Sequence, residues 1–60
     1  MNLWDVHAYD RNTHQLLLAG QIEAMSRQEA AMALFKQLRK IYPEDVRCYM
    51  TATKIGVIQR

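Results

Sequence analysis

The chain has 60 residues, of which 50% are hydrophobic and 23% are charged, and its eight basic and six acidic side chains give a formal net charge of +2. This length allows one domain, residues 1–60, and the balance of hydrophobic and charged residues excludes a disordered polar tail. The small positive charge permits an anionic partner but does not require one. Because a chain this short buries only about 60% of its unfolded surface, a partner or a second copy would add to its stability.

Cys48 is the single cysteine of the sequence. It excludes an internal disulfide, and nothing supplies the thiolate cluster of a zinc site, so a reducing cytoplasm is the expected location. The first residues lack the positive charge and apolar run of a signal peptide, and no stretch reaches membrane-spanning length. We therefore expect a soluble cytoplasmic protein with no membrane contact, no metal and no cofactor.

Two alternating segments open the chain. Leu3–Tyr9 has the period-two pattern of a strand. The polar segment Asp10–His14 predicts a hairpin loop, because aspartate and asparagine side chains bond to their own backbone in turns. Gln15–Ala24 alternates again and predicts a second strand. Gly20, in the middle of its apolar side, indicates either a close approach of another element or a bulge.

The longest periodic segment, Ser26–Tyr42, predicts an amphipathic helix. Ser26 and Glu29 form a capping box, in which each side chain satisfies a backbone donor at the helix start. Pro43 ends the helix, because it lacks an amide hydrogen and disfavours helical geometry at the residue before it. Apolar residues recur at three- and four-residue spacings along one face. That face carries Ala30, Ala31, Leu34, Phe35, Leu38, Ile41 and Tyr42.

A third alternating segment, Val46–Thr53, follows a turn and predicts another strand. Lys54–Arg60 contains strand-like residues, but Gly56 interrupts their pattern. This last segment therefore either extends the third strand through a bulge or forms a short fourth strand.

These elements predict an α+β domain in β-β-α-β order, with one amphipathic helix packed on one face of a three-stranded or four-stranded, mainly antiparallel sheet. A hairpin pairs the first two strands and the helix leads to the third, so the expected strand order is 2-1-3, with 1-2-3 as the alternative. The expected core contains Trp4, Val6, Ala8, Leu16, Leu18, Ile22, Leu34, Phe35, Leu38, Val46, Cys48 and Met50.

One helix covers only one face of such a sheet, so the other face is left uncovered by the chain itself. Large side chains gathered on an exposed surface indicate a binding surface, whereas scattered ones are normal on a solvated sheet face. We expect a small protein-interaction module, an adaptor or inhibitor of a larger protein. It would bind another protein, or a second copy of itself as a homodimer, through this face or an edge strand. The expected interface residues are Leu3, His7, Tyr9, Leu17, Arg47 and Tyr49.

The alternative is a nucleic-acid-binding accessory protein. Tyr9 and Tyr49 could stack on bases while basic side chains contact phosphates. Against this, the chain lacks the glycine- and aromatic-rich motif of base-stacking sheets, and Asp5 and Glu23 on the same face would repel phosphate. Cations in the last helical turn are also explained by the helix dipole. The candidate cations are Arg27, Lys36, Arg39, Lys40 and Arg47.

The sequence does not indicate an enzyme. His7, His14 and Cys48 occur without an acid, a base and a nucleophile at spacings that would bring them together. No pair of ligands has a spacing typical of metal sites, and the two glycines are too far apart for a phosphate loop. We expect no small-molecule substrate. The size of the chain is typical of inhibitors and adaptors that phages and mobile elements encode, which adds a phage origin to the expectation by analogy.

Overall fold

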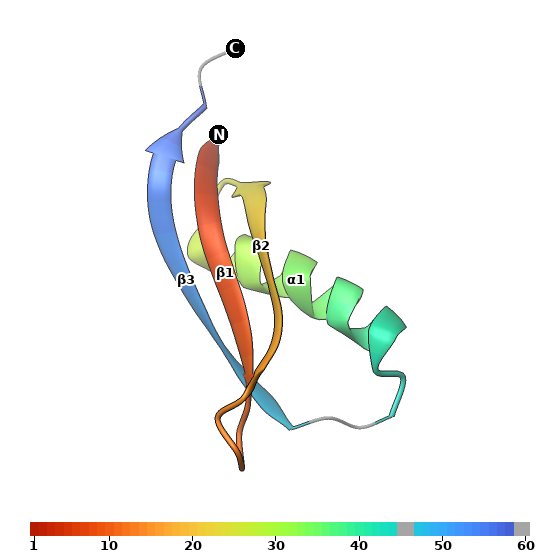
Figure 1. Ribbon diagram of the computed structural model, residues 1–60. Coiled ribbons are helices and arrows are strands. Elements are labelled where there is room, and N and C mark those ends of the chain that lie inside the picture. The colour runs from red at the N-terminus through yellow and green to blue at the C-terminus, as the bar shows by residue number, and fades with distance from the viewer. Residues whose placement is uncertain (45–46, 59–60) are drawn as a thin grey trace.

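The computed structural model describes residues 1–44 and 47–58. Its elements are the strands β1 (Asn2–Asp10), β2 (Leu16–Ala24) and β3 (Cys48–Val57) and the helix α1 (Arg27–Ile41), in the predicted β-β-α-β order. Both β2 and β3 pair antiparallel with β1, so the three-stranded sheet has the order β2-β1-β3 (Figure 1). The predicted order 2-1-3 is therefore confirmed, and the alternative 1-2-3 is wrong.

Strand β1 forms the centre of the core, because it has a strand on each side and α1 across one face (Figure 1). Its Trp4, Val6 and Ala8 side chains are buried, as predicted. The indole Nε1 of Trp4 donates a hydrogen bond to the carbonyl oxygen of Ala24 at 3.1 Å, so its polar atom is paired inside the core. The other core residues are the buried Ala24, Ala30, Leu34 and Leu38 and the half-buried Leu17, Leu18, Ile22, Cys48, Met50 and Ala52.

The helix is capped as the sequence predicts, with one difference in detail. Ser26 Oγ accepts a hydrogen bond from the Glu29 amide at 3.2 Å. The Glu29 carboxylate accepts a hydrogen bond from the Met25 amide at 3.1 Å, one residue before the expected donor. At the other end, the Tyr42 amide donates to the Leu38 carbonyl at 2.8 Å, and the proline that follows ends the helix.

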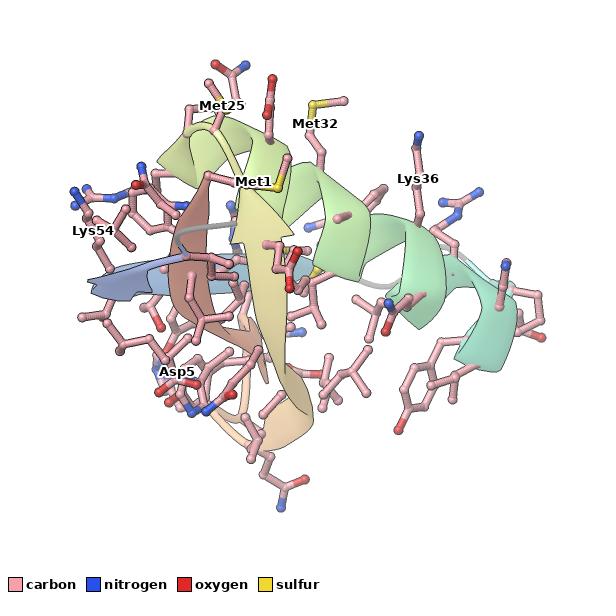
Figure 2. The ribbon with its side chains drawn as sticks, turned by 90° about the horizontal axis from the view of Figure 1, so that it is seen from above. Met1, Asp5, Met25, Met32, Lys36 and Lys54 are labelled. Carbon is pink, nitrogen blue, oxygen red and sulfur yellow. The ribbon has the colours of Figure 1, made fainter. Side chains whose placement is uncertain are left out.

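The C-terminal end of α1 runs past the sheet. In both views this end lies beyond β2, on the side away from β1 (Figures 1 and 2). Ile41 is on the same side of the helix as Leu34 and Leu38, yet it is 55% exposed because it lies past the edge of the described sheet. Phe35 is 40% exposed, and Tyr42 is exposed as well. The prediction that Phe35, Ile41 and Tyr42 are buried in the core is therefore wrong.

A β-bulge changes the alternation of β2 near its start. Between Ala8 and Tyr9 the pairing shifts by one residue, so Tyr9 lies opposite Leu16 and Leu17 is the extra residue. As a result Leu16 is exposed, and Leu17 is half-buried and packs against the core. The predicted inward position of Leu16 and outward position of Leu17 are both wrong.

A second bulge lies in β3, where Ile55 is the extra residue opposite Leu3 and Trp4. Strand β3 continues through it to Val57, so the extension through a bulge is confirmed and a separate strand at this point is wrong. Val46, where the third strand was predicted to start, lies outside the described residues, as do residues 59–60.

Gly20 marks a close approach of the helix and not a bulge. It pairs regularly with Val6 across the sheet. A Cβ atom built on it would lie 3.7 Å from Cδ1 of Leu34, which is an ordinary van der Waals distance. The helix therefore packs over this glycine but leaves room for a methyl group.

Candidate interaction surface

None of the described elements covers the face of the sheet opposite α1 (Figure 1). We call this surface the open face. Strand alternation brings every second side chain of each strand onto it, with the bulges as the only shifts within the described residues. Its residues are Leu3, Asp5, His7 and Tyr9 of β1, Leu16, Ala19, Gln21 and Glu23 of β2, and Tyr49, Thr51 and Thr53 of β3.

Four aromatic side chains form a continuous row at the end of the open face near the β1–β2 loop. The rings of His7 and Tyr9 stack with centroids 6.1 Å apart, and those of Tyr9 and Tyr49 stack at 5.4 Å. His14 meets Tyr49 edge-on at 5.9 Å, with its Nδ1 atom 3.1 Å from the Tyr49 hydroxyl. We call these four residues the aromatic row. Because stacked and edge-on contacts are both attractive, the rings hold one another in position.

The β1–β2 loop holds His14 against the row. Asp10 Oδ1 accepts hydrogen bonds from the amides of Asn12 at 2.7 Å and Thr13 at 3.0 Å. The bond from Thr13, and then that from Asn12, holds the pKa of the Asp10 carboxyl below its ordinary value, because both favour the charged form. The His14 amide donates to the Asp10 carbonyl at 2.9 Å, and its φ of 60° is left-handed. This turn brings the His14 ring to Tyr49.

Charge is divided along the open face. Beyond the two tyrosines, the Arg11 amide donates to the Arg47 carbonyl at 3.1 Å, so two basic residues lie side by side. Toward the opposite end the charged residues are Asp5 and Glu23, and Asp5 Oδ2 lies 3.9 Å from His7 Nε2, at the limit of an ion pair. The backbones of two basic residues therefore lie at the end of the sheet that carries the aromatic rings, and the carboxylates of the open face lie toward the other end.

The structure brings together only part of the predicted interface. His7, Tyr9 and Tyr49 are in contact, whereas Leu3 lies at the opposite end of the open face and Leu17 packs against the core. Among the described residues, the exposed large apolar side chains are Met1, Leu16, Met25, Met32, Phe35, Ile41, Tyr42, Ile55 and Val57. Most of them lie off the open face, which is therefore aromatic and polar in character.

Sequence reasoning missed His14, which belongs to the aromatic row, and Arg11, whose backbone lies at the same end of the sheet. Their signal was weak: both lie in the loop that joins the strand ending beside Tyr9 to the next strand. That position indicates proximity to the open face, but the direction of the His14 ring depends on the loop bonds to Asp10.

The cations predicted for nucleic-acid binding do not form one surface. Figure 2 shows Lys36 pointing away from the sheet, on the opposite side of the molecule from Asp5. The guanidinium of Arg39 lies over the Phe35 ring, 6.0 Å from its centre. The backbone of Arg47 lies instead at the end of the sheet that carries the aromatic row, where its carbonyl accepts a hydrogen bond from the Arg11 amide. The cations that α1 carries are Arg27, Lys36, Arg39 and Lys40.

Metal sites, reactive thiols and membrane-spanning helices are the other features that could carry a function. Within residues 1–44 and 47–58, no group of three or more His, Cys, Asp and Glu side chains is arranged to hold a metal ion. Cys48 is a half-buried free thiol that packs against the core. In the same part of the chain, no helix has both the length and the apolar character needed to cross a bilayer.

The architecture defines a small α+β domain, an open-faced three-stranded antiparallel sheet with one helix behind it. Comparison of the chain with protein-family models, with curated proteins and with solved structures finds no match.

Proposed function

We propose that this protein is a protein-interaction module, an adaptor or inhibitor of a larger cytoplasmic protein, which it binds with the aromatic row. The supporting observation is that His7, Tyr9, Tyr49 and His14 are assembled on a face that no described element of the chain covers. A phage or mobile-element origin is part of the proposal and rests on the small size of the chain.

The aromatic row has the composition of an interface hot spot. Tyrosine and arginine are enriched at positions whose truncation weakens binding by about 2 kcal/mol or more. Tyr9 and Tyr49 are half-buried by their neighbours, so their rings are held before a partner arrives and binding loses little rotamer entropy. Arg11 and Arg47, whose backbones meet at this end of the sheet, add positive charge nearby. The complementary partner surface is apolar or aromatic with acidic side chains next to it.

Affinity purification from the native host tests the proposal with the wild type, Tyr9→Ala and Gln21→Ala. Gln21 is exposed on the open face but away from the aromatic row, so it is the matched control. We expect the wild type and the control to retain the same protein, and Tyr9→Ala to bind it about 30-fold more weakly. Circular dichroism melts check that all three fold. Equal binding by all three proteins would contradict the aromatic row as the contact surface.

The pair Arg11 and Arg47 beside Tyr9 and Tyr49 favours a second candidate function, binding of single-stranded nucleic acid. Stacking on an aromatic ring contributes about 1–3 kcal/mol per base, and the cations would contact phosphates. Gel-shift titrations at two salt concentrations test it with the wild type and Arg47→Gln. We expect affinity to fall with salt, and Arg47→Gln to reduce the logarithmic slope by about 0.7. No binding to any single strand at low salt would exclude this candidate.

A further inference from the structure

The two edge strands of the sheet, β2 and β3, differ in how well they are protected against pairing with another chain. The helix α1 packs more closely on β2 than on β1 or β3, and it extends past β2 (Figures 1 and 2). A bulge also interrupts the pairing of β2 at Leu17, and Glu23 adds a charge. A covering helix, a bulge and a charged side chain all prevent an edge strand from pairing with another chain.

The segment Cys48–Thr53 of β3 lacks this protection. It contains no charged residue, no proline and no glycine. It pairs regularly with Asp5–Asp10 of β1, and the charge of Lys54 and the bulge at Ile55 come only after it. β3 is an outer strand of the sheet (Figure 1), so the backbone groups on its outer side have no partner strand among the described elements. Such an edge is a template for pairing with another strand.

The chain also exposes more surface than a compact protein of its mass. Its accessible surface is 4525 Å², whereas a compact monomer of 7.0 kDa exposes about 4,000 Å². Its radius of gyration is 11.8 Å, compared with about 10.4 Å expected for 60 residues. The chain therefore leaves more surface in solvent than its mass requires, and a second copy would cover part of it.

We propose that a second copy of this chain covers this edge, with β3 pairing antiparallel to β3 so that the two sheets become one. A two-fold axis normal to the sheet relates the two copies, so their open faces lie side by side on the same side of the joined sheet. In such an antiparallel pair, the residue nearest the axis lies opposite the same residue of the other copy. Within Cys48–Thr53 that residue is Met50 or Thr51. The paired segments bring no like charges together, and on the helix side they join the half-buried Met50 and Ala52 of both copies. This contact uses the backbone of β3, whereas the partner-binding surface proposed above uses side chains of the open face, and Tyr49 belongs to both.

Charge substitution at Thr51 tests the dimer. Thr51 is exposed on the open face, and it lies opposite or diagonal to its own copy in either register. Thr51→Lys brings two ammonium groups together and should raise the dissociation constant of the dimer about tenfold or more. An equimolar mixture of Thr51→Lys and Thr51→Glu should restore association. Ala19→Lys is the matched control and should change nothing, because Ala19 flanks His7 from β2 as Thr51 does from β3.

Sedimentation equilibrium up to millimolar protein measures association, and circular dichroism melts confirm that each variant folds. A wild type that stays monomeric throughout would overturn the proposal. So would an Ala19→Lys variant that weakens the dimer as much as Thr51→Lys does, or a mixture that fails to restore it. Tyr9 lies on the central strand, so Tyr9→Ala should leave the dimer intact while it impairs partner binding. Loss of the dimer in Tyr9→Ala would overturn the edge contact in favour of the aromatic row.

Discussion

At the scale of the residue, Asp10 organises the loop that holds His14 against Tyr49. Its carboxylate accepts two amide hydrogen bonds, and its pKa is lowered because both bonds favour the charged form. A lowered pKa in the folded state means that these bonds stabilise the protein fully above the ordinary aspartate pKa of about 3.9. This stabilisation is lost as the pH falls through the lowered pKa of the folded state.

We expect the melting temperature of the wild type to fall between about pH 5 and pH 2, and that of Asp10→Asn to fall less over the same range. The asparagine retains an accepting oxygen but does not titrate. Thermal melts of both proteins as a function of pH measure the effect. Because the other carboxyl groups titrate in both proteins, the difference between the two curves isolates Asp10. Parallel curves would show that its hydrogen bonds do not stabilise the loop.

Gly20 provides a second prediction at this scale. Its φ is not positive, and a Cβ atom there would make an ordinary contact with Leu34. Gly20→Ala should therefore raise the free energy of unfolding by about 0.4–1 kcal/mol, because alanine restricts the unfolded chain. Urea denaturation measures the change. Gly56→Ala, where the added Cβ has open space, is the matched control. If Gly20→Ala destabilised the protein and Gly56→Ala did not, the helix would have to lie closer to Gly20 than the 3.7 Å contact with Leu34 implies.

At the scale of the element, α1 is held by a short line of buried residues, and Leu34 lies at its middle with 1% exposure. Leu34→Ala should cost about 2–5 kcal/mol, a large share of the roughly 3–9 kcal/mol available to a chain of this length. Phe35→Ala is the matched control: a larger side chain is removed, but from a position that is 40% exposed. Urea denaturation should show the smaller loss for Phe35→Ala. The reverse order would mean that the buried face of the helix is misassigned.

The polar side of α1 yields the next prediction at this scale. Replacing Lys36, Arg39 and Lys40 together with Gln should change the helix little, because all three are exposed and Gln is a good helix former. Arg39 and Lys40 lie in the last turn, and their loss removes only a small favourable electrostatic interaction with the helix dipole. If nucleic acid binds at the aromatic row, gel shifts of this variant should match the wild type. A loss of binding would move the nucleic-acid site to the helix.

At the scale of the whole molecule, the two proposed contacts adjoin each other at β3, because Tyr49 belongs to the aromatic row and to the strand that pairs in the dimer. The aromatic row lies at one end of the open face, and the dimer contact lies along the outer edge of β3. A dimer through β3 would therefore carry two aromatic rows on one continuous face. Two linked contact sites would strengthen binding to a partner that presents two matching sites, by raising the effective concentration of the second contact.

Dimer formation also links stability to concentration. Because folded chains would associate and unfolded chains would not, the melting temperature of the wild type should rise with protein concentration. Thr51→Lys should show this rise only at concentrations about tenfold higher or more, while Ala19→Lys should follow the wild type. Differential scanning calorimetry at several concentrations measures this. A wild-type melting temperature that does not change with concentration would argue against the dimer.

Several features of this protein were determined by local sequence signals. Alternation in Leu3–Tyr9 predicted a strand, Ser26 and Glu29 predicted the helix start, and Pro43 predicted its end. These signals act over two to four residues, so they do not depend on how the elements later pack. The order of the elements and the buried side of β1 followed from them, and so did the presence of Tyr9 and Tyr49 on the uncovered face.

Tertiary structure decided the rest. The bulges at Leu17 and Ile55 arise from pairing with β1, which the sequence of a single strand does not specify. Because of the first bulge, Leu16 lies on the open face and Leu17 packs against the core, the reverse of the prediction. Ile41 continues the apolar stripe of its helix, but its burial depends on whether a strand lies opposite it. The aromatic row was likewise completed by His14 from a loop, through hydrogen bonds and a left-handed backbone. Periodicity assigns side chains to faces, whereas register and element length decide which of those faces meet.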